Sequence, residues 1–203
     1  SDMFVAADAS RSIFDFARRD KAGGKPWFMV VGLVNPHDIM FYDATGEQAK
    51  SRPHPDALAP VRREPGDPIY ETDLGFDLPE SFYKDDLSTK PQAHRAIQRQ
   101  NDRFFGDMPL SDIASWKRFR NYYYNCLRDV DRRLAQLLWA LKESGQIDNT
   151  IILYTTDHGE RAGAHGMRQK AGTIYREESN VPMIIVHPDH KGGRTTDKLM
   201  GAI

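Results

Sequence analysis

One short stretch of the sequence, residues 154–170, concentrates side chains that could bind a metal ion and an anion. It reads YTTDHGERAGAHGMRQK. Asp157 and His158 directly follow an apolar run, and a carboxylate beside an imidazole can face one divalent cation if the backbone turns sharply, which Gly159 permits. The alternative is that Asp157 caps a following helix and His158 is simply a polar neighbour. The pattern leaves both interpretations open.

A lysine and a second histidine follow in the same stretch. Lys170 suits an anionic substrate, because an ammonium group balances the charge on a sulfate or phosphate oxygen. A solvated lysine in a polar loop is the alternative. His165 could contact a substrate or orient another ligand, and packing within the loop is the alternative for this side chain.

A third candidate follows a different apolar run. His37 lies in the segment NPHD, just after residues 27–34, WFMVVGLV. An imidazole at this place could donate a proton to an oxygen of an ester substrate, and a histidine satisfied within a turn is the alternative. Cys126 lies inside a long amphipathic pattern, which favours a small core residue over a nucleophile.

The strands that would position these residues are short, apolar and β-favouring. Residues 27–34, 150–156 and 181–188 are typical of strands buried on both faces, as in parallel sheets. Their alternation with helical segments predicts an α/β fold with a mostly parallel central sheet flanked by helices. Ligands of such sheets bind beyond the carboxyl ends of the strands, where His37 and Asp157 are expected.

Two helices are predicted from hydrophobic positions three and four residues apart. They cover residues 9–19 and 115–144, and Gly145 is expected to end the second helix. Between them, residues 43–90 are rich in proline and irregular, which predicts a long loop insertion that shapes a pocket. We interpret residues 1–203 as part of a single catalytic domain.

Composition excludes several classes of protein. The chain has 203 residues, of which 39% are hydrophobic and 28% charged, and its formal net charge is −1. These values favour a packed core and argue against a disordered chain, a general nucleic-acid binder and a membrane-spanning protein. The single cysteine excludes an internal disulfide and a multi-cysteine zinc site.

Taken together and in this order, the motifs resemble the sulfatase family of the alkaline-phosphatase superfamily, especially its arylsulfatase and choline-sulfatase branches. TTDHGERAGAHGMRQKAGTIYREESNVPMIIVHP is similar to the family's catalytic segment, which has Ser/Thr-Asp-His/Asn-Gly, Gly-x-His-Gly, a lysine and a Val-Pro entry to a strand. KPWFMVVGLVNPHD resembles its strand that ends in Asn-Pro-His. The resemblance covers nearly the whole chain and implies a partial domain with an alkaline-phosphatase-like fold.

The resemblance also implies a role for each candidate. Asp157 and His158 would be metal ligands. Lys170 and His37 would be catalytic, at the sulfate oxygens and the ester oxygen respectively, and His165 would bind substrate. The implied activity is hydrolysis of a small anionic sulfate ester, with Ca²⁺ as the expected metal. Mn²⁺ or Zn²⁺ is expected if the substrate is instead a phosphonate monoester or phosphodiester.

One family motif has no match in the sequence. The family's nucleophile is a cysteine or serine in Cys/Ser-x-Pro-x-Arg, which is converted to formylglycine. Cys126 is followed by Leu-Arg-Asp, and Ser51 begins SRPHP, in which Pro55 stands in place of the arginine. We therefore expect an internal fragment, inactive by itself, with formylglycine upstream. A phosphonate or phosphodiester hydrolase and a non-catalytic binding paralogue are the alternatives.

Overall fold

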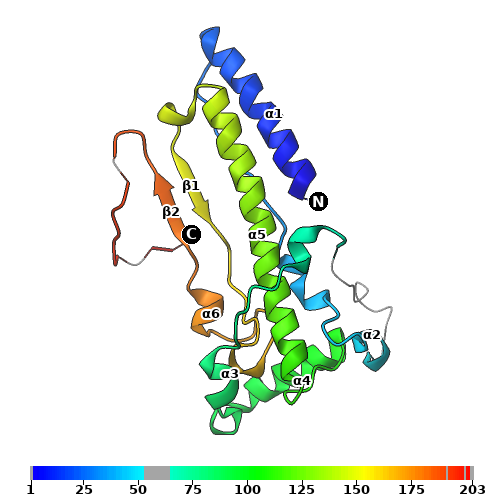
Figure 1. Ribbon diagram of the computed structural model, residues 1–203. Coiled ribbons are helices and arrows are strands. Elements are labelled where there is room, and N and C mark those ends of the chain that lie inside the picture. Colours follow the sequence, from blue (N-terminus) through cyan, green and yellow to red (C-terminus); the bar gives the residue numbers. More distant parts are fainter. Residues whose placement is uncertain (1, 53–64, 191, 199, 202–203) are drawn as a thin grey trace. The chain divides into compact units, whose positions relative to one another are not determined.

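The chain folds into two compact units, each with its own apolar core. Figure 1 shows its helices and strands. The computed structural model describes residues 2–52, 65–190, 192–198 and 200–201. The first unit comprises Ser1–Leu33, Asp131–His158 and Asn180–Ile203, and the second comprises Val34–Val130 and Gly159–Ser179. The long helix α5, Ile113–Glu143, therefore supplies residues to both units.

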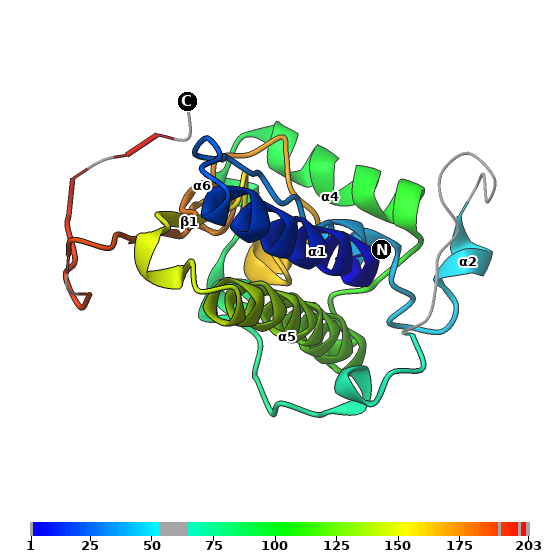
Figure 2. The ribbon, with the colours of Figure 1, turned by 90° about the horizontal axis from the view of Figure 1, so that it is seen from above.

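In the first unit, α1 packs along the last turns of α5. Helix α1 spans Asp2–Lys21, so the helix predicted over residues 9–19 is confirmed but begins earlier. In two perpendicular views α1 lies beside α5 (Figures 1 and 2). Ile13 meets Ala140 and Leu141, with 1%, 0% and 6% of their surfaces exposed, and apolar side chains around them complete the core. Burial of these apolar faces holds the two helices together.

Gly145 ends α5 as predicted. Its φ of +77° lies in the left-handed region, which glycine adopts without a steric penalty. Its N–H donates to the carbonyl of Lys142 at 3.0 Å, and the N–H of Gln146 donates to that of Leu141 at 2.9 Å. These bonds satisfy carbonyls that the helix leaves without partners.

The described sheet is a pair of antiparallel strands, β1 and β2, which differs from the predicted parallel arrangement. Strand β1 spans Ile152–Thr155 and β2 spans Met183–Val186, with Leu153 opposite Ile185 and Thr155 opposite Met183. The predicted runs 150–156 and 181–188 are thus strands, but they run in opposite directions. Apolar composition identifies a strand without specifying the direction of its neighbour, which explains the error.

The run at residues 27–34 forms no strand in the structure, contrary to prediction. Its side chains alternate between partly buried and exposed, and Phe28 and Val30 have 87% and 79% of their surfaces exposed. Trp27 is anchored by donation from Nε1 to Gln146 Oε1 at 2.7 Å. Burial on both faces requires paired strands and covering layers, and an apolar sequence supplies neither by itself.

The second unit surrounds an aromatic and aliphatic core. Trp116 and Phe119 from the start of α5 pack with Ile39, Leu78 and Met108, and all five are nearly inaccessible to solvent. The described residues of this unit also form α2 Gln48–Ser51, α3 Glu80–Lys84, α4 Gln92–Phe105 and α6 Arg176–Ser179. Helix α4 was not predicted, because its apolar positions are few.

The described parts of the proline-rich segment 43–90 contain short helical elements. These are α2, α3 and short 3₁₀ turns at Pro68–Glu71 and Leu87–Thr89, while residues 53–64 lie outside the described chain. Asn121 and Asn125 of α5 donate to the carbonyl of Thr72 at 3.0 and 2.9 Å. Side-chain amides of the long helix therefore fix part of this segment.

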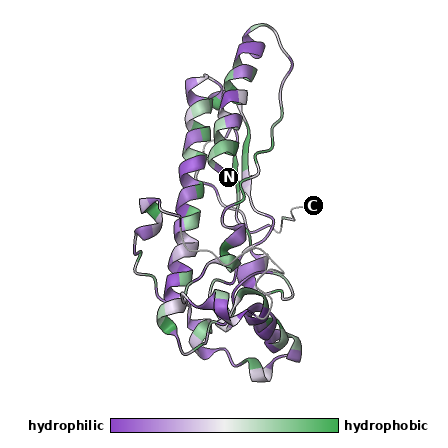
Figure 3. Cartoon of the chain, turned by 90° about the vertical axis from the view of Figure 1, so that its right-hand side faces the viewer, coloured by the Kyte–Doolittle hydropathy of each residue, from purple (hydrophilic) through white to green (hydrophobic). Residues whose placement is uncertain are grey.

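Both long helices are amphipathic along their length, with hydrophilic and hydrophobic residues interspersed (Figure 3). On α1, Arg11 pairs with Asp8 and Arg18 pairs with Asp15 on exposed positions.

Across the residues that the structure describes, every helix is too short or too polar to cross a membrane.

Cys126 is buried in α5, with 2% of its surface exposed, as expected for a core residue. We predict that Cys126→Ser leaves catalytic turnover within twofold of the parent and lowers the free energy of unfolding by about 1–2 kcal/mol, because the hydroxyl must be satisfied in the core. Turnover and denaturant unfolding measure the two effects. Complete inactivation of a folded variant would restore Cys126 as a nucleophile candidate.

Candidate active site

Lys170 and His37, far apart in the sequence, meet in the second unit. The Lys170 ammonium donates to the backbone carbonyl of His37 at 2.5 Å, and only 8% of the lysine is exposed. The His37 imidazole is exposed, and its Nδ1 lies 2.9 Å from Asp38 Oδ1. The structure thus brings the two predicted catalytic residues together through a backbone carbonyl, and it leaves the imidazole accessible.

The loop that carries Lys170 has an unusual backbone. Ala162, His165, Gln169 and Ala171 have φ values of +44°, +60°, +71° and +71°. Each non-glycine residue in this left-handed region costs about 1–3 kcal/mol and persists only where surrounding contacts enforce it. Strain of this kind is concentrated on both sides of the lysine, at positions 169 and 171.

A buried arginine occupies the centre of the loop. Arg161 has 1% of its surface exposed, and it donates to the carbonyls of Gln169 at 2.7 Å and Arg168 at 3.2 Å. It also donates to Thr173 Oγ1 at 3.2 Å and lies 3.8 Å from Glu178 Oε1. Burial lowers its pKa, and the carboxylate of Glu178 opposes that effect. One guanidinium therefore contacts several residues of this loop.

His165 is held between two carboxylates. Its Nδ1 lies 2.5 Å from Asp85 Oδ2, its Nε2 lies 3.3 Å from Glu177 Oε2, and its ring stacks on Tyr175 with centroids 3.7 Å apart. Lys90 also pairs with Asp85, at 2.7 Å. These contacts are those of the packing interpretation, and substrate binding by His165 stays a prediction.

Asp157 and His158 lie in the first unit, directly after β1. Asp157 Oδ1 accepts from the N–H of His158 at 3.0 Å, and His158 Nε2 lies 3.5 Å from Asp157 Oδ2. Residues 158–163 form no helix, so Asp157 caps none there. Partial burial raises the pKa of Asp157, but the charge of His158 and backbone hydrogen bonds outweigh it, so the net pKa is lowered. The carboxylate is ionised and available to a cation.

With the strand-end pair and the lysine loop described, comparison with known proteins identifies the family. The Sulfatase family model matches residues 1–203. The chain belongs to the sulfatase family. The family expected from the sequence is thus confirmed, and the roles of the individual candidate residues stay predictions.

Individual sulfatases are similar to this chain at modest identity. An arylsulfatase of Volvox carteri is 28% identical over 82% of the chain and 24% of its own length. An arylsulfatase of Clostridium perfringens is 25% identical over 92% of the chain and 33% of its own length. The solved structure of a 2-O GAG sulfatase, BT1596, superposes with a TM-score of 0.64 at 20% identity, over 92% of this chain and 35% of that one. The superposition supports an alkaline-phosphatase-like fold, and the chain spans about a quarter to a third of its relatives' lengths.

Asp157 and His158 carry donor atoms of the kinds that bind a divalent metal ion, and their role as metal ligands stays a prediction. Their side chains are 82% and 37% exposed, and one carboxylate oxygen and one imidazole nitrogen lie close enough to share an ion. Within the described residues, no group of three or more His, Cys, Asp or Glu side chains forms a complete metal site. An oxygen and a nitrogen donor suit Mn²⁺ or Zn²⁺ better than Ca²⁺, which prefers oxygen donors.

Sequence reasoning missed the buried charges beside the lysine. Glu160 and Arg168 have 8% and 1% of their surfaces exposed. Burial raises the pKa of Glu160 despite the charge of Lys170, and burial lowers the pKa of Arg168 to about 10. A charged residue in a glycine-containing loop is ordinarily solvated, so composition gave no signal that these were buried.

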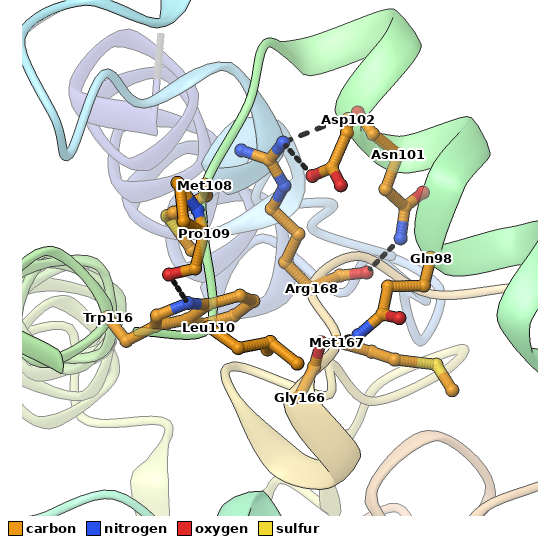
Figure 4. Close-up of a pocket in the computed structure, with 10 residues that line it drawn as sticks. All are labelled: Gln98, Asn101, Asp102, Met108, Pro109, Leu110, Trp116, Gly166, Met167 and Arg168. Atoms are coloured by element: carbon orange, nitrogen blue, oxygen red, sulfur yellow. Dashed lines mark hydrogen bonds and ion pairs between the residues drawn. The ribbon is translucent and has the colours of Figure 1, made fainter. Parts of the chain in front are cut away.

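Arg168 lines a cavity of about 120 Å³ in the second unit (Figure 4). Its Nη2 lies 3.3 Å from Asp102 Oδ1, while its buried Nε and Nη1 have no hydrogen-bond partner among the described residues. We expect ordered water molecules in the cavity to satisfy these groups. The lining residues are Gln98, Asn101, Asp102, Met108, Pro109, Leu110, Trp116, Gly166, Met167 and Arg168.

Gly159, which directly follows Asp157 and His158, permits two chain segments to approach closely. A Cβ at this position would lie 2.0 Å from the carbonyl oxygen of Glu177, and the Gly159 N–H donates to the carbonyl of Glu178 at 2.8 Å. We predict that Gly159→Ala lowers the free energy of unfolding by about 3 kcal/mol or more. The control is Gly66→Ala, where a Cβ meets nothing within 4 Å. Equal melting temperatures for the two variants would contradict the prediction.

Proposed function

We propose that the protein to which this chain belongs is a metal-dependent hydrolase of small sulfate esters. The observation that carries the proposal is the Lys170 ammonium, which is withdrawn from solvent and held on the turn that carries His37. A cation kept in a poorly solvated place interacts strongly with an anion that reaches it. Family membership supports sulfate as that anion.

Each candidate residue then has a defined task. Lys170 binds the sulfate oxygens and neutralises the negative charge that develops on them. The exposed imidazole of His37 donates a proton to the leaving oxygen, and its contact with Asp38 orients the ring. These two groups bind and orient the ester. The nucleophile is not supplied by a Cys/Ser-x-Pro-x-Arg motif in this sequence.

Asp157 and His158 are the residues that would hold the metal ion. When bound, a divalent ion supplies positive charge that polarises the ester and lowers the barrier to attack. The contact between His158 N–H and Asp157 Oδ1 fixes the carboxylate and leaves Oδ2 directed to the imidazole side.

A second candidate is hydrolysis of a phosphonate monoester or a phosphodiester. His158 favours it, because imidazole is a common ligand of Mn²⁺ and Zn²⁺ and a poor ligand of Ca²⁺. Lys170 and His37 would interact with a phosphoryl oxygen as favourably as with a sulfate oxygen. These two residues therefore do not distinguish the substrates, and the metal and the substrate must be determined together.

Parallel assays of the full-length protein distinguish these functions. We would measure turnover of 4-nitrophenyl sulfate, 4-nitrophenyl phenylphosphonate and bis(4-nitrophenyl) phosphate after loading with Ca²⁺, Mn²⁺ or Zn²⁺. The proposal predicts the highest kcat/KM for the sulfate ester. A preference for either phosphorus ester would establish the second candidate. A folded, metal-loaded protein that turns over none of them would be a binding paralogue.

A further inference from the structure

The carboxylate of Glu160 bridges the two ends of the Lys170 loop. Its Oε1 accepts from the N–H of Ala162 at 3.3 Å and from the N–H of Gln169 at 2.5 Å. Each of these bonds satisfies a backbone donor that the buried loop would otherwise leave unpaired. One buried side chain therefore closes the loop directly before the lysine.

Both polar backbone groups of Gln169 are held by consecutive side chains. Glu160 accepts from the Gln169 N–H, and Arg161 Nε donates to the Gln169 carbonyl at 2.7 Å. With its N–H and its carbonyl both engaged, the residue before Lys170 cannot rotate without breaking a buried hydrogen bond. Breaking either bond would leave a buried polar group unsatisfied, which is costly.

The hydrogen bonds of Glu160 and Arg161 to Gln169, here called the clamp, counteract local backbone strain. Gln169 and Ala171, on either side of Lys170, both have φ of +71°. Without enforcing contacts, residues of these types would relax to negative φ and carry the lysine side chain away. The clamp thus fixes the direction of a side chain that no regular helix or strand supports.

Helix α4 anchors Arg168, the residue before Gln169. Asn101 Nδ2 donates to the Arg168 carbonyl at 2.7 Å, and Arg168 Nη2 lies 3.3 Å from Asp102 Oδ1, as Figure 4 shows. Residues 168 and 169 are consequently both fixed, one by α4 and the other by Glu160 and Arg161.

Glu160 also interacts electrostatically with Lys170. Its Oε2 is buried and has no hydrogen-bond partner among the described residues, and the charge of Lys170 acts on the carboxylate. The Lys170 ammonium itself donates to His37.

We propose that Glu160 is a positioning residue that acts on the substrate only through Lys170. Its carboxylate holds the strained backbone around the lysine, so that the ammonium is preorganised for an anionic ester. This inference rests on the proposed function and deepens it, because it assigns the placement of the anion-binding lysine to a side chain that does not touch substrate.

A double-mutant cycle in the full-length protein tests the proposal. Glu160→Gln keeps the size of the side chain and one acceptor oxygen but replaces the other carboxylate oxygen with an amide nitrogen. We expect it to lower kcat/KM for 4-nitrophenyl sulfate about tenfold in the parent background, because small misplacements of a catalytic group are costly. In a Lys170→Ala background the same substitution should change kcat/KM by less than twofold, because the two residues act as one unit.

The matched control is Asp43→Asn, which neutralises another loop carboxylate that accepts two backbone N–H groups, from Gly46 at 2.8 Å and Gln48 at 3.2 Å. It should change kcat/KM by less than twofold. Thermal unfolding verifies that each variant is folded. If Glu160→Gln does not fold, Arg161→Lys, which removes the planar donor to the Gln169 carbonyl, enters the same cycle.

The outcomes separate this inference from the function on which it rests. Equal losses from Glu160→Gln in both backgrounds, or no loss in the parent, would overturn the positioning role while leaving sulfate-ester hydrolysis intact. Normal turnover by Lys170→Ala alone would overturn both the proposed role of the lysine and any action through it.

Discussion

Replacing Lys170 with alanine is expected to lower kcat on a sulfate ester by about two to three orders of magnitude, which corresponds to about 3 kcal/mol of lost charge stabilisation. The effect should be this large because the ammonium is largely withdrawn from solvent, where its interaction with an anion is weakly screened. Steady-state turnover of 4-nitrophenyl sulfate by the full-length protein measures it.

A matched control separates the anion-binding role from loss of a positive charge in general. Lys117 pairs with Asp77 at 3.0 Å on the surface of the same unit, and both side chains are substantially exposed. Lys117→Ala should leave kcat within twofold of the parent. If the two alanine variants retained the same turnover, Lys170 would have no special place in the reaction.

Replacing Asp157 with alanine is expected to remove the bound metal and to abolish turnover. The substitution deletes an ionised ligand and leaves His158 without the neighbour that lies 3.5 Å from its Nε2. We expect the metal content per chain, measured by elemental analysis after dialysis, to fall at least about tenfold, since loss of even an indirect metal contact costs 10–100-fold in affinity.

Asp148→Ala is the corresponding control. Asp148 belongs to the same unit and lies in the short 3₁₀ turn Ile147–Asn149, before β1. Its substitution should preserve both metal content and activity. Unchanged metal content in Asp157→Ala would remove Asp157 from the metal site, whatever happened to turnover, because the carboxylate would then serve only the local turn.

The family and the candidate residues could be predicted from the sequence, because their chemistry is local. A carboxylate, an imidazole and a glycine in succession after an apolar run indicate a polar strand end, for which cation binding is a prediction. Gly145 specifies a helix end for an equally local reason, since only glycine adopts positive φ without a penalty. The 3.6-residue periodicity of α5 likewise depends on near neighbours.

Strand direction, burial and loop conformation depended on tertiary contacts. The run at residues 27–34 has the composition of an interior strand, yet Phe28 is 87% exposed in the structure. Pairing and covering layers decide such burial, and they come from other parts of a fold.

The loop that carries Lys170 shows most clearly which features depend on the sequence and which depend on the tertiary structure. The sequence by itself determined that Lys170 follows the Asp-His-Gly motif and belongs to the sulfatase pattern. Only the tertiary structure decided that Glu160 and Arg161 are buried, that they hold both polar backbone groups of Gln169, and that the lysine reaches the carbonyl of His37. The physical reason is that a charged side chain in a loop is normally solvated. It can be interior only when the folded loop brings polar partners to it, and no local pattern encodes that arrangement.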